Sequence, residues 1–211
     1  MDRQLNKFDR RKRLLLPAVL CAVVFGLLLV SVCKKEAPAP SKAPPTASLE
    51  KPAEPAKNVL HSSLAGTWYP SDANALREQI EGFFEKASIK PIENVTALIL
   101  PHAGYQYSGQ TAAMGLKTVG KKSKRVVVIG PSHRLPMEEV RSVARATNYE
   151  TPRGQTPLDV EFINELLKYP VFQNVPGTDE YEHSVQIEVP LLQYCQAGFK
   201  LVPIVAGSCS Q

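Results

Sequence analysis

The chain has 211 residues and a formal net charge of +5 at pH 7. The charge is uneven, because residues 1–57 hold eleven Lys or Arg against five Asp or Glu, whereas residues 58–211 hold fourteen against fifteen. A nearly neutral globular part argues against a nucleic-acid partner, and the basic run at residues 121–125 is interpreted as a solvated loop.

The N-terminus predicts attachment to a membrane. Residues 1–13 form a basic flank, and residues 14–33 form an apolar segment whose first nineteen residues carry no charge. That length can cross a bilayer as a helix, and the basic flank should stay in the cytoplasm. Cys33 leaves a lipoprotein signal as the alternative to an uncleaved anchor. We therefore expect a membrane-anchored protein with an extracytoplasmic globular domain, in the periplasm or at the cell surface.

The rest of the chain divides into a linker and one domain. Residues 34–57 are rich in Pro and Ala and predict an extended spacer, whereas residues 58–211 suffice for one domain with a core. The globular part contains Cys195 and Cys209, which are too few for a disulfide framework. They either form a single bridge or remain separate, with Cys195 buried on a helix.

The first half of this domain predicts a β-α-β unit. Ser71 or Asp72 can cap a helix that runs through Phe84. A continuous apolar strand is expected at residues 95–100, followed by a short helix over residues 111–119 and a strand at residues 125–129. The right-handed crossover rule makes the two strands parallel.

The second half continues the alternation of strands and helices. Residues 138–148 are expected to form a strand or an arm, residues 157–167 a helix, and residues 199–205 an apolar strand. A helix over residues 185–194 requires a kink or a late start at Pro190. The predicted fold is α/β, a three-layer-like domain with a mostly parallel sheet flanked by helices.

Two predicted strands each end in a proline and a histidine. His102 follows residues 95–100, and His133 follows the strand at residues 125–129. Ligands of open α/β sheets bind at the carboxyl ends of strands, so the two imidazoles could share a metal ion. The alternative is that each one hydrogen-bonds its loop. A third ligand is not evident from spacing, and the candidates are Asp179, Glu180, Glu182, Glu188 and Cys209.

His183 is the candidate catalytic residue. It stands at the head of a predicted helix, where the helix dipole disfavours imidazolium, so it should remain neutral and able to exchange protons. A capping or packing role is the alternative. Tyr105 and Tyr107 could offer hydroxyl groups to a pocket or serve in packing, and no nucleophile elbow surrounds Ser132.

Four motifs together resemble one family. They are Gly66-Thr67-Trp68-Tyr69-Pro70, Pro101-His102-Ala103-Gly104-Tyr105, Gly130-Pro131-Ser132-His133 and Glu182-His183-Ser184. In this order they resemble the Memo family, called AmmeMemoRadiSam system protein B in bacteria and archaea, which is similar to LigB-type class III extradiol dioxygenases. The resemblance implies that His102 and His133 bind metal and that His183 lies near the pocket. It implies Fe(II), with Zn(II) or copper as alternatives.

The resemblance also implies differences from the family. Its members continue through a segment with an Asp-Phe-Cys-His-like motif and a later metal ligand, so the domain at residues 58–211 is expected to be truncated at its C-terminus. The leading hypothesis is a metal-binding protein with dioxygenase-like chemistry on an unknown substrate. The alternatives are a non-catalytic module that binds a small molecule, a peptide or a partner in the same cleft, and a zinc hydrolase.

Overall fold

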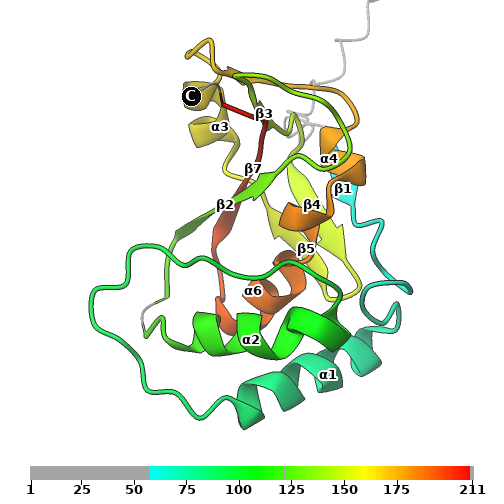
Figure 1. The fold of residues 1–211 in the computed structure, drawn as a ribbon, viewed down its shortest axis with the longest axis vertical. Coiled ribbons are helices and arrows are strands. Elements are labelled where there is room, and N and C mark those ends of the chain that lie inside the picture. The colour runs from blue at the N-terminus through cyan, green and yellow to red at the C-terminus, as the bar shows by residue number, and fades with distance from the viewer. Residues whose placement is uncertain (1–57, 121, 210–211) are drawn as a thin grey trace, which may run out of the picture. The chain divides into compact units, whose positions relative to one another are not determined.

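Two β-sheets and a group of helices make up the described part of the chain. The computed structural model describes residues 58–120 and 122–209. One sheet has the order β2 (Arg125–Pro131), β7 (Lys200–Ala206), β3 (Arg141–Val143), β6 (Phe172–Gln173). The other has the order β1 (Val59–His61), β4 (Asn148–Thr151), β5 (Gly154–Pro157). Helices α1 (Ala73–Lys86), α2 (Tyr105–Lys117) and α6 (Val189–Cys195) lie together beside the sheets (Figure 1).

The predicted α/β fold class is confirmed, but the prediction of one mostly parallel sheet is wrong, because the structure has two sheets of mixed strand direction. β2 pairs with β7 in parallel, and β3 pairs with β6 in parallel, whereas β3 and β7 are antiparallel. The second sheet is also mixed, because β4 runs parallel to β1 and antiparallel to β5. Its short strands carry polar residues and lack the apolar runs that indicate buried strands.

Helix α1 forms where the sequence predicts it. The carboxylate of Asp72 caps the helix by accepting a hydrogen bond from the backbone N–H of Ala75 at 2.8 Å. Leu76 and Ile80 lie on one face and are fully buried. At the far end the ammonium group of Lys117 donates to the carbonyls of residues 84 and 87, which joins α1 to α2. The helix pair is thus fixed both by its apolar stripe and by its termini.

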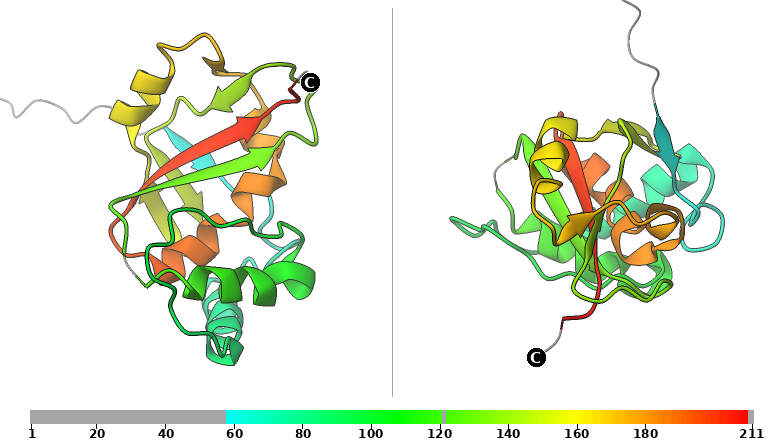
Figure 2. Two further views of the ribbon diagram at one scale, coloured as in Figure 1. Left: turned by 60° about the vertical axis from the view of Figure 1, so that its left-hand side comes forward. Right: turned by 90° about the horizontal axis from the view of Figure 1, so that it is seen from above.

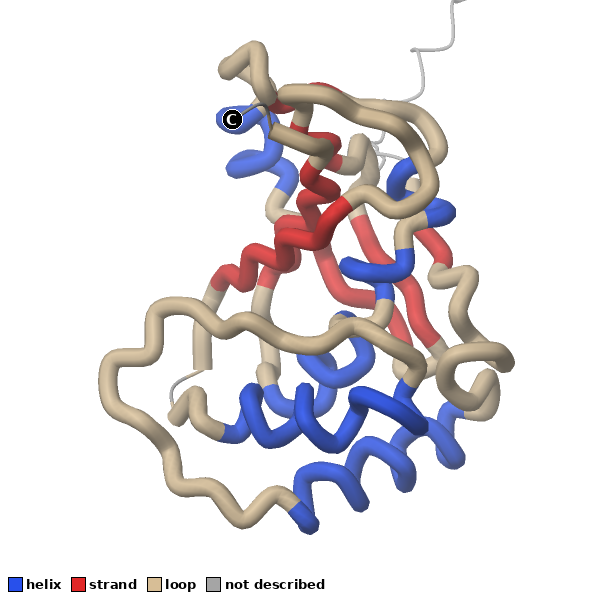
Figure 3. The backbone as a smooth tube through the Cα atoms, in the orientation of Figure 1, coloured by secondary structure: helices blue, strands red, loops and turns tan. Residues whose placement is uncertain are grey.

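Residues 95–100 are not a strand, contrary to the prediction. They belong to the long loop between α1 and α2, drawn in tan in Figure 3. A strand requires a hydrogen-bonded partner, and none of the described strands pairs with this segment. The apolar run therefore lies beside the sheet without joining it. Helix α2 begins earlier than predicted, at Tyr105 after the cap residue Gly104.

The C-terminal half follows the predicted order with more breaks. Two short helices, α3 (Val160–Leu166) and α4 (Thr178–Tyr181), precede α5 (His183–Gln186). The predicted helix at residues 185–194 is divided into α5 and α6, and Pro190 lies in the first turn of α6, where a missing N–H is tolerated. Figure 2 shows β7 beside β2, with which it pairs in parallel.

The remaining expectations concern the cysteines and the N-terminus. Cys195 is half-buried on α6, Cys209 is exposed, and both are free thiols. The structure therefore favours separate cysteines, and burial raises the pKa of Cys195 to about 11. The basic flank, the apolar segment at residues 14–33 and the linker lie outside the described residues. Within residues 58–120 and 122–209, no helix is long and apolar enough to cross a membrane.

Candidate metal centre

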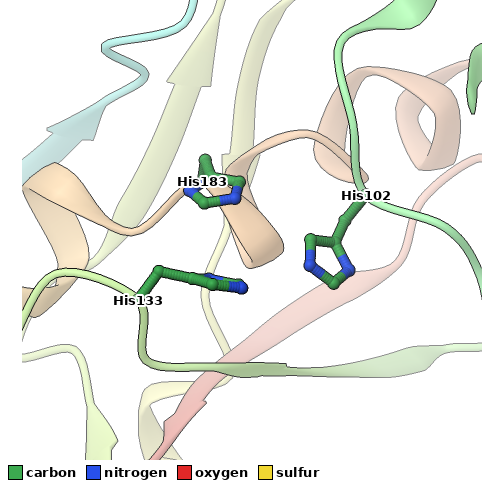
Figure 4. Close-up of side chains that lie close together, drawn as sticks. All are labelled: His102, His133 and His183. Atoms are coloured by element: carbon green, nitrogen blue, oxygen red, sulfur yellow. The ribbon is translucent and has the colours of Figure 1, made fainter. Parts of the chain in front are cut away.

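Three histidines from distant parts of the sequence meet at one end of β2. His102 lies in the loop before α2, His133 follows β2 by two residues, and His183 is the first residue of α5. One nitrogen from each ring lies within 4.8 Å of the other two (Figure 4). The structure thus brings the two sequence-predicted ligands and the predicted catalytic histidine into one cluster.

The loop that carries His102 is held by the start of α2. The backbone N–H of Tyr105 donates to the carbonyl of Trp68 at 2.9 Å. The buried side-chain hydroxyl of Tyr105 donates to the carbonyl of Ile187 at 3.0 Å. The hydroxyl of Ser108 donates to the carbonyl of Ala103 at 2.7 Å. Tyr105 is therefore a packing residue, while Tyr107 is exposed.

The end of β2 is held against α5 by a close approach. A Cβ atom at Gly130 would overlap the hydroxyl of Ser184, so glycine allows the strand to approach the helix. The same hydroxyl donates to the carbonyl of Pro131 at 2.9 Å. These contacts fix His183 relative to His133. The neighbouring Ser132 donates its own hydroxyl to Leu135 at 2.6 Å, which gives it a structural hydrogen bond.

Glu182 is the buried anion of the site. One of its oxygens accepts from the backbone N–H of His133 at 2.6 Å, and the other lies 2.8 Å from Nδ1 of the same residue. The backbone N–H of Ser184 donates to it at 2.9 Å. Burial raises the pKa of Glu182, but these hydrogen bonds outweigh burial and hold it at about 2. The ionised carboxylate accepts a hydrogen bond from Nδ1–H of His133. The lone pair on Nε2 of the same ring is then free to bind a metal ion.

His183 is enclosed by rings. Its imidazole stacks on that of His133 with 4.4 Å between ring centroids and 29° between planes. The ring of Trp68 also contacts His183, with 4.6 Å between the two ring centroids. Burial lowers the pKa of His183, although the carboxylate of Glu182 acts in the opposite direction. Nδ1 of His183 is buried and makes no hydrogen bond within the described residues, although it lies 3.4 Å from Oε1 of Glu182, the oxygen that also faces Nδ1 of His133. The ring is therefore expected to be neutral.

The cluster of potential metal ligands formed by the three histidines includes none of the five residues that the sequence offered as a third ligand, namely Asp179, Glu180, Glu182, Glu188 and Cys209. Glu182 orients His133, and Cys209 accepts from the guanidinium of Arg141 at 2.7 Å. The backbone carbonyls of Asp179 and Glu180 accept from the amide of Gln186. Burial raises the pKa of Asp179 to about 6. Sequence reasoning did not find the contact of Trp68 with His183, although Trp68 belongs to the first family motif.

A cleft of about 370 Å³ adjoins His102. Residues 95–98 and Leu100 line one side, and residues 125–130 of β2 line the other. Glu188 also lines it with 6% of its surface exposed, and Oε2 of Glu188 has no hydrogen-bond partner in the described part of the chain. Burial raises the pKa of Glu188 to about 7. The cleft is therefore lined by both apolar and polar groups, and Glu188 is a buried acid within it.

The fold and site define an α/β protein with a histidine cluster at the carboxyl end of a parallel strand. Comparison of the sequence with family models gives a match to the Memo-like protein family over residues 61–211. The chain belongs to the Memo family, which confirms the resemblance seen in its motifs.

Curated relatives come from bacteria, archaea and vertebrates. A MEMO1 family protein of Aquifex aeolicus is 38% identical over 70% of this chain and 54% of its own length. Protein MEMO1 of Danio rerio is 32% identical over 71% of this chain and 52% of its own, and a MEMO1 family protein of Ignicoccus hospitalis is 36% identical over 70% and 56%. The chain thus spans about half the length of these relatives.

Proposed function

We propose that this Memo family protein binds one redox-active metal ion, Fe(II), through His102 and His133. The observation that carries the proposal is the hydrogen bond of 2.8 Å between Nδ1 of His133 and the buried carboxylate of Glu182. Metal-bound histidines commonly donate their second N–H to a carboxylate, which fixes the tautomer and the direction of the ring. The ring of His102, tilted by 52° to that of His133, supplies the second imidazole.

The donor chemistry fits such an ion. Imidazole binds Fe(II), Zn(II) and copper, so Zn(II) and copper are the alternative occupants. An iron ion bound here would supply the redox chemistry for an O2-dependent oxidation of the kind that LigB-type enzymes perform. The exposed ring of His133 and the cleft beside His102 leave access for a small molecule or a peptide.

His183 is assigned the proton transfer. Its ring is stacked on that of His133, and the in-plane lone pairs of two nearly parallel rings do not converge on one ion. The 2.8 Å hydrogen bond with Glu182 favours His133 as the ligand of the two. The lowered pKa keeps His183 neutral, so it can accept a proton from a bound molecule. Trp68 holds the ring in place by direct contact, with 4.6 Å between centroids.

The proposed setting is the extracytoplasmic side of a membrane. The support is the sequence of residues 1–57 alone, with its basic flank, its apolar segment and its Pro-rich spacer. In this arrangement the spacer carries no chemistry and holds the metal-binding domain away from the bilayer.

The experiment that tests metal binding is an anaerobic titration of the full chain with Fe(II). One equivalent is expected to bind to the wild type and to His61→Ala, which removes the remaining histidine of the chain. His61 is exposed and pairs with Glu150 at 2.7 Å in the other sheet, so it serves as a matched control. Failure of the wild type to bind Fe(II), Zn(II) or copper would contradict the proposal.

Glu182→Gln is expected to weaken Fe(II) binding by about 10–100-fold, the usual effect of removing a partner that orients a metal ligand. The neutral amide oxygen of Gln accepts a weaker hydrogen bond from Nδ1–H than a carboxylate does, so the ring of His133 loses its charge-assisted hydrogen bond. The measurement is the dissociation constant in the same titration. Glu180→Gln, an exposed neighbour, is the control. An unchanged constant for Glu182→Gln would show that the carboxylate does not serve the ligand.

A further inference from the structure

A small internal cavity lies next to Glu182. It is bounded by residues from β4, α4, α5 and β7 and has a volume of about 10 Å³. Its lining residues are Tyr149, Thr178, Asp179, Glu182, Val185, Gln186, Pro203 and Val205. One water molecule needs about 10–15 Å³ of such space. The cavity shares no lining residue with the cleft beside His102, and it has the size of a single water molecule.

The hydroxyl of Tyr149 is an unsatisfied donor at this cavity. Tyr149 is 1% exposed, and its hydroxyl oxygen has no hydrogen-bond partner among the described residues. The hydroxyl of Ser62 is near it, but that group is already bonded to Tyr69 and to Gln186. Burial raises the pKa of Tyr149 well above its usual value, so the hydroxyl keeps its proton. A buried donor of this kind requires an acceptor.

Two carboxylates line the same cavity and have lone pairs to offer. Oε2 of Glu182 accepts one hydrogen bond, from the backbone N–H of His133 at 2.6 Å, and a carboxylate oxygen can accept two. The carboxylate of Asp179 makes no hydrogen bond or ion pair within residues 58–120 and 122–209. The polar side-chain atoms of Thr178 and Gln186 are already satisfied by other partners. One donor and two acceptors therefore remain.

These three groups match the hydrogen-bonding capacity of a water molecule. A water molecule accepts from a hydroxyl and donates to two acceptors at the same time, and buried polar cavities of sufficient size are normally hydrated. A metal cation has no lone pair to offer to the O–H of Tyr149. An anion would lie against the carboxylates of Asp179 and Glu182 and would be repelled by both. Water is therefore the occupant that the lining residues select.

We propose that one buried water molecule occupies this cavity, where it accepts a hydrogen bond from Tyr149 and donates to Glu182 and Asp179. Through the water, Tyr149 and Asp179 act as positioning residues for Glu182, whose other oxygen lies 2.8 Å from Nδ1 of His133. A bridging water is nearly as favourable as a direct hydrogen bond. The water site stands without a metal ion, and its importance for metal ligation rests on the proposed function.

The first test counts the buried water in the metal-free full chain. Magnetic relaxation dispersion of ¹⁷O detects water molecules that stay bound for longer than the protein takes to rotate. The signal of Tyr149→Phe is expected to fall by one such molecule at pH 8, where Asp179, whose pKa burial raises to about 6, is ionised. Tyr181→Phe, at an exposed position on α4, is the matched control and should keep the wild-type signal.

A second substitution makes this test independent of the folding of Tyr149→Phe. Asp179→Ala opens the cavity and removes one acceptor, so the long-lived water should again be lost. Asp179→Asn keeps an acceptor oxygen and should retain the water. Equal signals in the wild type, Tyr149→Phe and Asp179→Ala would overturn the proposal.

The second test measures the positioning of Glu182 by the ¹H–¹⁵N NMR signal of Nδ1–H of His133, again without metal. A carboxylate that loses the hydrogen bond from water binds its remaining donors more strongly. The proton signal is therefore expected to move downfield in Tyr149→Phe and to stay unchanged in Tyr181→Phe. An unshifted or upfield signal in a variant that has lost the water would refute the positioning role. Because no metal is present, neither result depends on whether the chain binds Fe(II).

Discussion

Replacement of both His102 and His133 by Ala is expected to reduce Fe(II) affinity by at least about a hundredfold. Loss of an outer partner of one ligand already costs about 10–100-fold, and the double variant removes the two donor atoms themselves. His102 is only partly buried and the ring of His133 is 39% exposed, so the variant should fold. The measurement is the anaerobic titration, with circular dichroism as the check on folding.

His183→Gln separates the two roles assigned to the cluster. It should retain Fe(II) in the titration, because His183 is assigned proton transfer and not ligation. Binding of one equivalent by the double variant, or loss of binding in His61→Ala, would contradict the assignment of His102 and His133. Loss of binding in His183→Gln would instead make His183 a ligand.

Glu188→Gln is expected to change how stability depends on pH. Burial raises the pKa of Glu188 from 4.5 to about 7, so between these values the folded chain keeps a proton that the unfolded chain has lost. This contribution to stability is fully present below pH 4.5 and is lost as the pH rises through 7. The loss amounts to at most about 3 kcal/mol, which Gln avoids because it cannot ionise.

Urea unfolding at pH 5 and at pH 8 measures this effect. The variant should be close to the wild type in free energy of unfolding at pH 5 and more stable by up to about 3 kcal/mol at pH 8. Glu78→Gln, on the exposed face of α1, is the control and should show no such difference. An equal pH dependence in wild type and Glu188→Gln would mean that the carboxylate acquires a partner in solution.

Local patterns in the sequence were enough to predict the elements that are stabilised locally. The Asp72 cap and the Leu76–Ile80 stripe define α1 because both act within a few turns of the chain. The apolar runs likewise indicate β2 and β7, which pair with each other in parallel. The four motifs also led to the family. The second sheet was missed because its strands are short and polar, and their pairing is set by tertiary contacts.

The error at residues 95–100 has a different cause. Their composition predicts a strand, but strand formation depends on a hydrogen-bonded partner, which no local pattern reveals and which the described strands do not provide. The site was predicted in part for a related reason. The matched contexts of His102 and His133 suggested that they meet, whereas the function of Glu182 depends on which of several neighbouring carboxylates is buried under His133. Only the three-dimensional packing distinguishes Glu182 from Asp179 and Glu180.

In the proposed site the rings of His102 and His133 bind the metal, and the ring of His183 does not. Long-range ¹H–¹⁵N NMR of the full chain with Zn(II), a diamagnetic substitute for Fe(II), tests it most directly, with single-histidine variants for assignment. We expect the NMR signal of one ring nitrogen in each of His102 and His133 to shift on Zn(II) binding, and Nδ1 of His133 to stay protonated. Unshifted nitrogens in both rings, in a sample that has taken up the metal, would contradict it.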